Sequence, residues 1–220
     1  MSQIAASPDA KTGAKITLGG VATSGQYPQV PSILATTLCS GWTVDTVAQL
    51  RQAVQVVVAA NPILAGRASF EKIDGKKRAV VETGVFDDFF QEVAAPAGLP
   101  SVVGLSLSER LAVGASGPVA DAFGTVGTGA AQVKKKSPLF RFKVMTLPAD
   151  PGHGYYFVDL SHMLGDGTTF YEIISLVNRA LQGEEGDALV LTCVLFPPQR
   201  HSIFVFLVFV FSFLSVYRET

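Results

Sequence analysis

The sequence has few of the residues that mark disulfide-rich or metal-binding proteins. Its two cysteines, Cys39 and Cys193, lie far apart and form no C-x-x-C pair, so we predict neither a disulfide framework nor a zinc site. The three histidines, at positions 153, 162 and 201, have no metal-ligand spacing. This composition fits a reducing compartment best, and we expect a cytoplasmic protein.

Charge is also sparse, and neither sign dominates. Charged residues make up 16% of the chain, with 17 Lys and Arg against 18 Asp and Glu, a net charge of −1. No general electrostatic attraction to nucleic acid is expected, so we predict no nucleic-acid partner. The glycine-rich stretch Gly124–Gly129 lacks the order of both common phosphate-binding loops, and we interpret it as a linker.

The most informative stretch runs from Tyr155 to Leu181. Residues Tyr155–Ser161 are mostly β-branched or aromatic, which predicts a largely buried strand that ends at His162. The glycines in Met163–Gly167 favour a sharp turn. A helix is expected next, because Thr169–Glu172 fits a capping box and apolar residues then recur at helical spacing up to Leu181.

This arrangement would hold the imidazole of His162 at the end of a strand, within reach of a substrate. Imidazole has an ordinary pKa of about 6.5, so at neutral pH it accepts protons readily. A positioned general base of this kind typically accelerates a reaction by ~100 to 10,000-fold. The alternative interpretation is that His162 is a polar strand-end residue and Asp166 an ordinary turn former.

Ahead of this stretch we expect an extended segment, a helix and a hairpin. The segment Gln29–Leu38 is interpreted as extended, and the helix begins after Thr43 or Asp45 and ends at Asn61-Pro62. A strand over Ile63–Ile73 should turn at Asp74-Gly75 and return through Arg78–Glu82.

The region between the two hairpins is expected to be rich in loops. We predict a loop-rich excursion over Pro96–Gln132, and Lys134–Lys136 is interpreted as a solvated edge or as a contact for a phosphate-bearing donor such as coenzyme A. In Ser137–Val144 apolar and basic residues alternate, which predicts a half-buried strand. After turn residues Pro148–Gly154 the chain should return along Tyr155–Ser161 as a hairpin.

Three motifs in these segments resemble the chloramphenicol acetyltransferase-like superfamily. They are P-I-L-A-G-R at 62–67, P-L-F-R at 138–141 and H-x-x-x-D-G at 162–167. The superfamily includes BAHD acyltransferases, condensation domains of peptide synthetases and wax ester synthases. The resemblance implies a mixed α/β fold of two similar halves, of which this chain covers the first half only.

The resemblance also implies an activity and roles for three residues. The superfamily transfers an acyl group from a thioester, here expected to be acyl-CoA, to a hydroxyl or amine acceptor. His162 would be the general base, Asp166 would orient the loop and the histidine, and Gly167 would permit the turn. Acyl-CoA would act as a co-substrate, and no permanently bound cofactor or metal is expected.

The chain divides into three parts by composition. We expect a flexible N-terminus at 1–26, an acyltransferase-like half-domain at 27–187 and a hydrophobic tail at 188–220. Within the tail, Ser202–Tyr217 has no charge and five phenylalanines. As a helix this run would span ~24 Å, short of a ~30 Å hydrocarbon core.

The tail leaves three interpretations open. It is a short membrane anchor facing the cytoplasm, a buried element, or a segment foreign to the domain that a gene model has added. The late D-F-G-W-G motif of BAHD enzymes is absent from the sequence. The alternatives to an active acyltransferase are therefore an inactive truncated fragment and a tail-anchored binding module.

Overall fold

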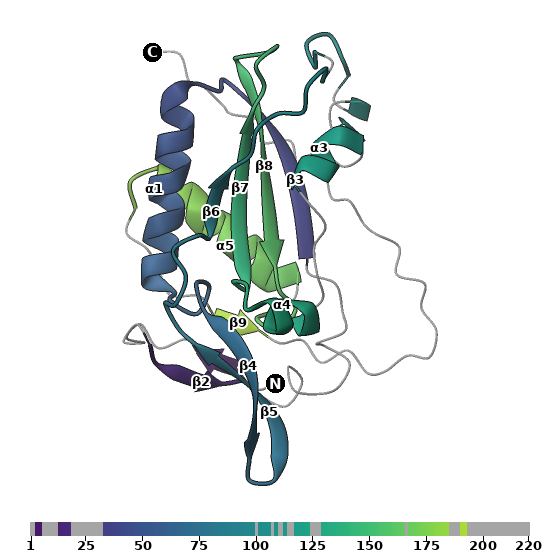
Figure 1. The fold of residues 1–220 in the computed structure, drawn as a ribbon. Helices are drawn as coiled ribbons and strands as arrows, with labels where there is room; N and C mark the ends of the chain where they lie inside the picture. Colours follow the sequence, from purple (N-terminus) through teal and green to yellow (C-terminus); the bar gives the residue numbers. More distant parts are fainter. Residues whose placement is uncertain are drawn as a thin grey trace.

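A computed structural model describes residues 3–5, 13–18, 33–99, 101–106, 108–109, 112–113, 117–123, 129–165, 167–184 and 190–192. These residues form a mixed α/β structure (Figure 1). The strands are β1 (Gln3–Ala5), β2 (Lys15–Thr17), β3 (Ile33–Ser40), β4 (Arg67–Ile73), β5 (Lys76–Glu82), β6 (Phe90–Glu92), β7 (Phe140–Thr146), β8 (His153–Leu160) and β9 (Val190–Thr192). The helices are α1 (Val44–Ala60), α3 (Gly117–Phe123), α4 (Gly129–Lys135) and α5 (Gly167–Leu181).

The largest sheet has the order β3-β8-β7-β6, with β8 in its interior. Strand β8 runs antiparallel to both β3 and β7, and β6 runs parallel to β7. Helices α1 and α5 pack against one another and share one core with this sheet (Figure 1). That core includes Phe142 and Leu160 from the sheet and Val54 and Ile173 from the two helices.

Strand β7 confirms the alternation predicted for Ser137–Val144, since Phe140, Phe142 and Val144 are buried while the basic residues between them are only partly buried. Part of the opposite face of the sheet is also covered. Tyr155 and Phe157 of β8 point away from α1 and α5 and pack in a second core with Val102, Val119 and Phe123. The rings of Phe123 and Phe157 stack with centroids 5.1 Å apart. The segment expected to be a loop-rich excursion therefore contains α3 and α4, and α3 helps to bury this face.

Helix α1 begins and ends as predicted. The hydroxyl of Thr43 accepts a hydrogen bond from the Thr46 backbone N–H, and the Thr46 hydroxyl accepts one from the Thr43 N–H, so a threonine replaces the usual Glu or Gln of a capping box. At the other end, the Asn61 side-chain amide donates to the Val57 carbonyl at 2.9 Å. These bonds satisfy backbone groups that a helix end leaves exposed.

The hairpin β4–β5 confirms the predicted turn but not the predicted strand start. Asp74 and Gly75 have φ angles of 51° and 75°, as a two-residue hairpin turn requires. Residues 63–66 form a buried turn rather than a strand, in which the Gly66 N–H donates to the Ile63 carbonyl at 3.0 Å. Strand β4 begins only at Arg67. Gly66 lies so close to β5 that a Cβ there would be 2.4 Å from Val81 Cγ1.

Part of the N-terminus expected to be flexible forms a strand. Strand β2 pairs with β5 in the sheet β2-β5-β4, where Ile16 lies opposite Val81. Leu18, which follows it, is 3% exposed in the main core.

Residues 193–220, including Ser202–Tyr217, lie outside the described residues. Within the part of the chain that is described, no helix has both the length and the apolar character needed to cross a membrane.

A buried carboxylate fastens the β7–β8 turn to the neighbouring segment. Asp150 accepts hydrogen bonds from the Ser101 hydroxyl at 2.7 Å and from the Val102 N–H at 2.5 Å. The Ser101 hydrogen bond is the main cause that lowers the pKa of Asp150. His153, expected within the turn, is instead the first residue of β8.

Replacing Asp150 with asparagine should lower the unfolding temperature at pH 7. Because the pKa of Asp150 is lower in the folded chain than in the unfolded chain, ionisation stabilises the fold above the unfolded pKa. This stabilisation is lost as the pH falls through the folded pKa. The difference in unfolding temperature between Asp150→Asn and the wild type should therefore become smaller as the pH is lowered below about 4. Thermal unfolding of both proteins from pH 7 to pH 3 measures this difference. Asp87→Asn, at an exposed site, is the control. A difference in unfolding temperature that stays constant over this pH range would contradict the prediction.

Candidate active site

The candidate site begins where β8 leaves the sheet. Leu160, its last residue, pairs with Ile33 of β3 and Phe140 of β7. The N–H of Ser161, which is fully buried, donates to the Leu139 carbonyl at 2.8 Å. The sheet therefore still holds the backbone one residue before His162.

His162 lies in the tight turn that follows. The Leu164 N–H donates to the Ser161 carbonyl at 2.9 Å, which closes the turn around His162 and Met163. Met163 and Leu164 are each 1% exposed and belong to the main core, whereas His162 is only partly buried. The backbone is thus fixed on both sides of a histidine whose side chain keeps some access to solvent.

The return into α5 depends on a close approach between Gly165 and Thr169. A Cβ at Gly165 would lie 2.2 Å from Thr169 Oγ1, and Thr169 is fully buried. Helix α5 begins at Gly167, so the predicted capping box at Thr169–Glu172 is wrong in position. Thr169 therefore lies in the first helical turn, with its side chain against Gly165 of the loop.

The other two predicted site residues are Asp166 and Gly167. Asp166 lies outside the described residues. Gly167 is exposed, its φ is not in the left-handed region, and a Cβ there would have no neighbour within 4 Å. Gly165 also lacks a left-handed φ. The structure therefore requires the missing Cβ at Gly165 and shows no such need at Gly167.

Charged residues on neighbouring strands lie close to this turn, and the sequence did not single them out. Asp159, three residues before His162, is 2% exposed and lies opposite Arg141 in the β7–β8 register. Burial is the main cause that lowers the pKa of Lys143, and the positive charge of Arg141 adds to it. Knowledge of the β7–β8 register would have predicted that Arg141 and Asp159 lie opposite each other.

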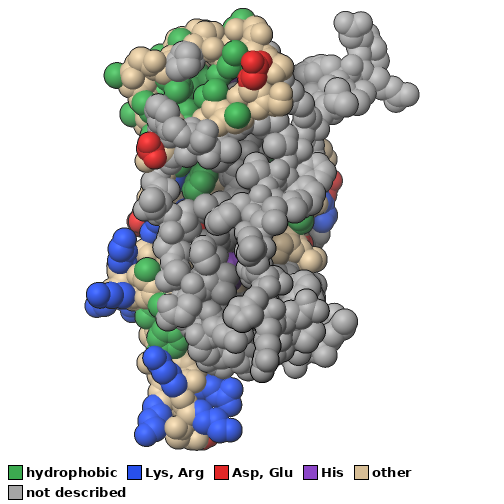
Figure 2. Space-filling model, turned by 90° about the vertical axis from the view of Figure 1, so that its right-hand side faces the viewer, with side chains coloured by type: hydrophobic (Ala, Val, Ile, Leu, Met, Phe, Trp, Pro, Cys, Tyr) green, Lys and Arg blue, Asp and Glu red, His purple; other side chains and the backbone are tan. Residues whose placement is uncertain are grey.

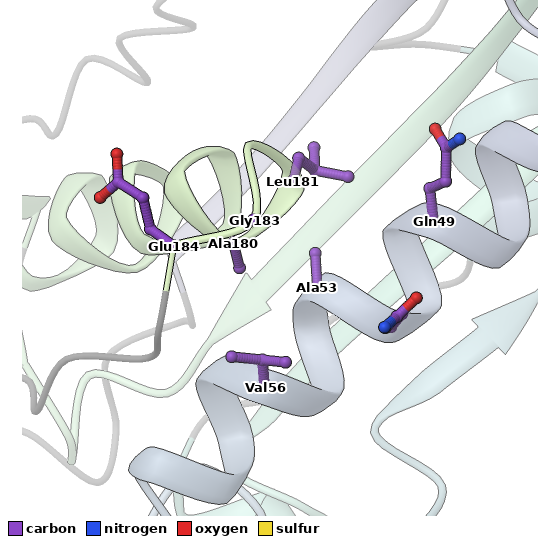
Figure 3. Close-up of a pocket in the computed structure, with 8 residues that line it drawn as sticks. Gln49, Ala53, Val56, Ala180, Leu181, Gly183 and Glu184 are labelled. Atoms are coloured by element: carbon purple, nitrogen blue, oxygen red, sulfur yellow. The ribbon is translucent and has the colours of Figure 1, made fainter.

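A surface groove of about 460 Å³ lies between α1 and the end of α5 (Figure 3). Small residues open this space, since Ala53, Ala180 and Gly183 lie where the helices face one another. Its polar lining consists of Gln49, Gln52 and Glu184. The length of α5, ~22 Å for its 15 residues, separates the groove from the His162 turn.

A smaller pocket of about 250 Å³ lies beside Asp150, at the end of β8 opposite to His162. Neither cavity contains a histidine. Among the described residues, no group of three or more His, Cys, Asp and Glu side chains is arranged to hold a metal ion.

No family model matches the chain, and no curated protein matches it. Solved structures do match. TRI101 of F. sporotrichioides, complexed with coenzyme A and T-2, is 13% identical with a TM-score of 0.53, over 78% of this chain and 42% of that protein. TRI101 of F. graminearum, complexed with ethyl coenzyme A, is 16% identical with a TM-score of 0.54, over 78% and 40%.

The starter condensation domain of rhizomide synthetase RzmA is less similar, at 17% identity and a TM-score of 0.47 over 76% of this chain and 38% of that domain. The chain spans about two-fifths of the length of the TRI101 proteins that it matches. The described structure therefore has part of the chloramphenicol acetyltransferase-like fold, as the sequence predicted.

Proposed function

We propose that this chain is the histidine-bearing part of an acyltransferase that moves an acyl group from acyl-CoA to a hydroxyl or amine. The fold shared with TRI101 supports the general class, and TRI101 is complexed with coenzyme A in several of its structures. The H-x-x-x-D-G motif supports the residue roles: His162 as general base, Asp166 as the residue that orients the loop, and Gly167 as part of the turn.

In the proposed reaction His162 accepts the proton of the acceptor O–H or N–H while that atom attacks the thioester carbonyl. The new C–O or C–N bond forms, the C–S bond breaks, and the proton passes from the imidazolium to the departing sulfur. The acyl group moves directly from donor to acceptor, so no nucleophilic serine or cysteine is required.

One observation carries this proposal: the backbone is fixed on both sides of a partly exposed histidine. Ser161 is held by the sheet and Leu164 by the core, so few motions remain that would displace His162. General bases act well only when their distance to the transferred proton is controlled.

Release of coenzyme A tests the proposal. The purified chain is incubated with acetyl-CoA and longer acyl-CoAs over a panel of alcohols and amines, and free thiol is measured. Acceptor-dependent release, with the acylated acceptor identified by mass spectrometry, would support it. Thiol release without an acylated acceptor would contradict acyl transfer.

The partial coverage of TRI101 favours a second candidate, in which the chain acts only with a complementary half. In that case the folded chain alone shows no turnover, and turnover appears when a second acyltransferase half is added or fused. An inactive binding module would stay inactive under both conditions.

A further inference from the structure

A basic surface lies at the hairpin end of the molecule, and the role proposed for His162 makes no use of it. It consists of two sequence spans, 72–78 on the β4–β5 hairpin and 134–136 at the end of α4. Helix α4 packs against β4, so the two spans lie on one part of the molecule. The cations of this basic surface are Lys72, Lys76, Lys77, Arg78, Lys134, Lys135 and Lys136.

The basic surface gives the molecule a strong charge asymmetry. All its lysines are exposed, and Asp74 is the one acidic residue in the two spans. Seven of the chain's 17 basic residues lie here, which leaves 10 basic residues against 17 acidic residues elsewhere in the sequence. Figure 2 shows Lys and Arg side chains gathered at the hairpin end of the molecule.

Within the hairpin these charges are placed at a cost to stability. Lys72 and Lys77 lie directly opposite each other in the β4–β5 register, and like charges in that position destabilise a strand pair. Lys77 lies over the ring of Phe70, 4.5 Å from its centroid, which offsets part of the repulsion. By contrast, the cations nearer the base are paired, as Lys15 is with Glu71 and Arg67 with Glu82.

A second feature that costs stability lies at the C-terminal end of α4. The Ser137 N–H donates to the Gln132 carbonyl and the Lys136 N–H to the Val133 carbonyl, the pattern of a Schellman cap. Such a cap favours glycine, yet Lys136 occupies the position with a φ of 51°. Attraction to the helix C-terminus accounts for Lys134 and Lys135, but it does not account for a lysine in this conformation.

The shape of the basic surface favours an extended anionic partner over a small anion. The hairpin projects from the body of the molecule (Figure 1) and carries cations on both faces, since Lys72 and Lys77 point to one face and Lys76 and Arg78 to the other. Cations distributed around a convex tip contact an extended anionic surface into which the tip is placed. A flat acidic protein patch would reach only one face.

We propose that the basic surface binds the anionic headgroups of a lipid bilayer. Two features favour lipid over another polyanion. The acidic remainder of the chain opposes wrapping by nucleic acid, and the sequence also contains the uncharged apolar run Ser202–Tyr217. Stable membrane binding generally needs two weak signals together, such as an apolar segment and a basic patch. This inference does not depend on acyl transfer.

Vesicle binding by the full chain tests the proposal. Partition is measured on phosphatidylcholine vesicles with and without phosphatidylserine, and the difference between them isolates the basic surface from any effect of the apolar run. Each cation near an anionic bilayer strengthens binding about fivefold, so the double variant Lys72→Gln/Lys77→Gln should lose roughly 10- to 30-fold in partition to the anionic vesicles. Raising the salt from about 0.1 M to about 1 M should weaken wild-type binding.

The matched control is Arg51→Gln/Arg179→Gln, which removes the same charge from paired cations outside the basic surface. The control should bind like wild type. The Lys72→Gln/Lys77→Gln protein should unfold at no lower temperature than wild type, because the substitution relieves a like-charge pair. Equal partition to both vesicle types, or equal losses in both double variants, would overturn the proposal. Tighter binding to poly-glutamate or to duplex DNA than to anionic vesicles would also overturn it.

Discussion

The His162→Ala variant should release coenzyme A from acyl-CoA ~100 to 10,000 times more slowly than the wild-type chain in the presence of an acceptor. The expected loss is large because alanine removes the group proposed to accept the proton, whereas the turn itself is held by Ser161, Met163 and Leu164. The fall should appear in kcat, since the imidazole is proposed to act on a proton that moves in the transition state.

His153→Ala is the matched control, because His153 begins the strand that leads to His162 at its other end. This variant should turn over like wild type, and both variants should retain wild-type circular dichroism and unfolding temperature to within a few degrees. Full activity in His162→Ala would show that another group acts as the base. Equal losses in the two histidine variants would indicate a structural cause instead.

Two glycines of the site turn should respond to alanine in opposite ways. Gly165→Ala should lower the free energy of unfolding by ~1–3 kcal/mol, because its Cβ would lie 2.2 Å from the Thr169 hydroxyl and Thr169 is too buried to move aside. Gly167→Ala should be neutral or stabilise by ~0.4–1 kcal/mol, because its Cβ meets no atom within 4 Å and alanine restricts the unfolded chain.

Urea unfolding of the two variants and the wild type measures both effects. If the Gly165 contact also positions the turn, the folded Gly165→Ala protein should show lower turnover than the wild type in the absence of urea. The Gly167→Ala protein should keep wild-type turnover. A Gly167→Ala protein that is less stable than Gly165→Ala would contradict the geometry described for the turn. It would show that the turn requires glycine at position 167 instead.

Local signals in the sequence were sufficient for much of the fold. The Asp74-Gly75 turn and the ends of α1 were predicted correctly because each depends on residues within a few positions of one another. The order of strand, turn and helix around His162 was predicted for the same reason. The helix start was misplaced because Thr169–Glu172 fits a capping pattern although the helix begins two residues earlier, at Gly167, where Thr169 packs against Gly165.

The remaining errors come from contacts between distant segments. Strand β2 was missed because Lys15–Thr17 is polar and becomes a strand only by pairing with β5. The second core was missed because Val119 and Phe123, which help to form it, lie in a segment of weak local pattern. The pairing of Arg141 with Asp159 likewise follows from the β7–β8 register, so these two residues shared no local signal in the sequence.

The position of β8 between β3 and β7 also constrains when the site can form in a newly made chain. Every partner that β3 meets on β8 lies more than a hundred residues later in the sequence. At the usual rate of synthesis, ~5–20 residues per second, β3 waits on the order of ten seconds before its partner strand leaves the ribosome. Closing so long a loop is slow for any β-pairing. We therefore expect the His162 turn to be among the last parts of the described structure to assemble, and nascent chains that stop before β8 to leave the backbone N–H and C=O groups of β3 without their partner strand.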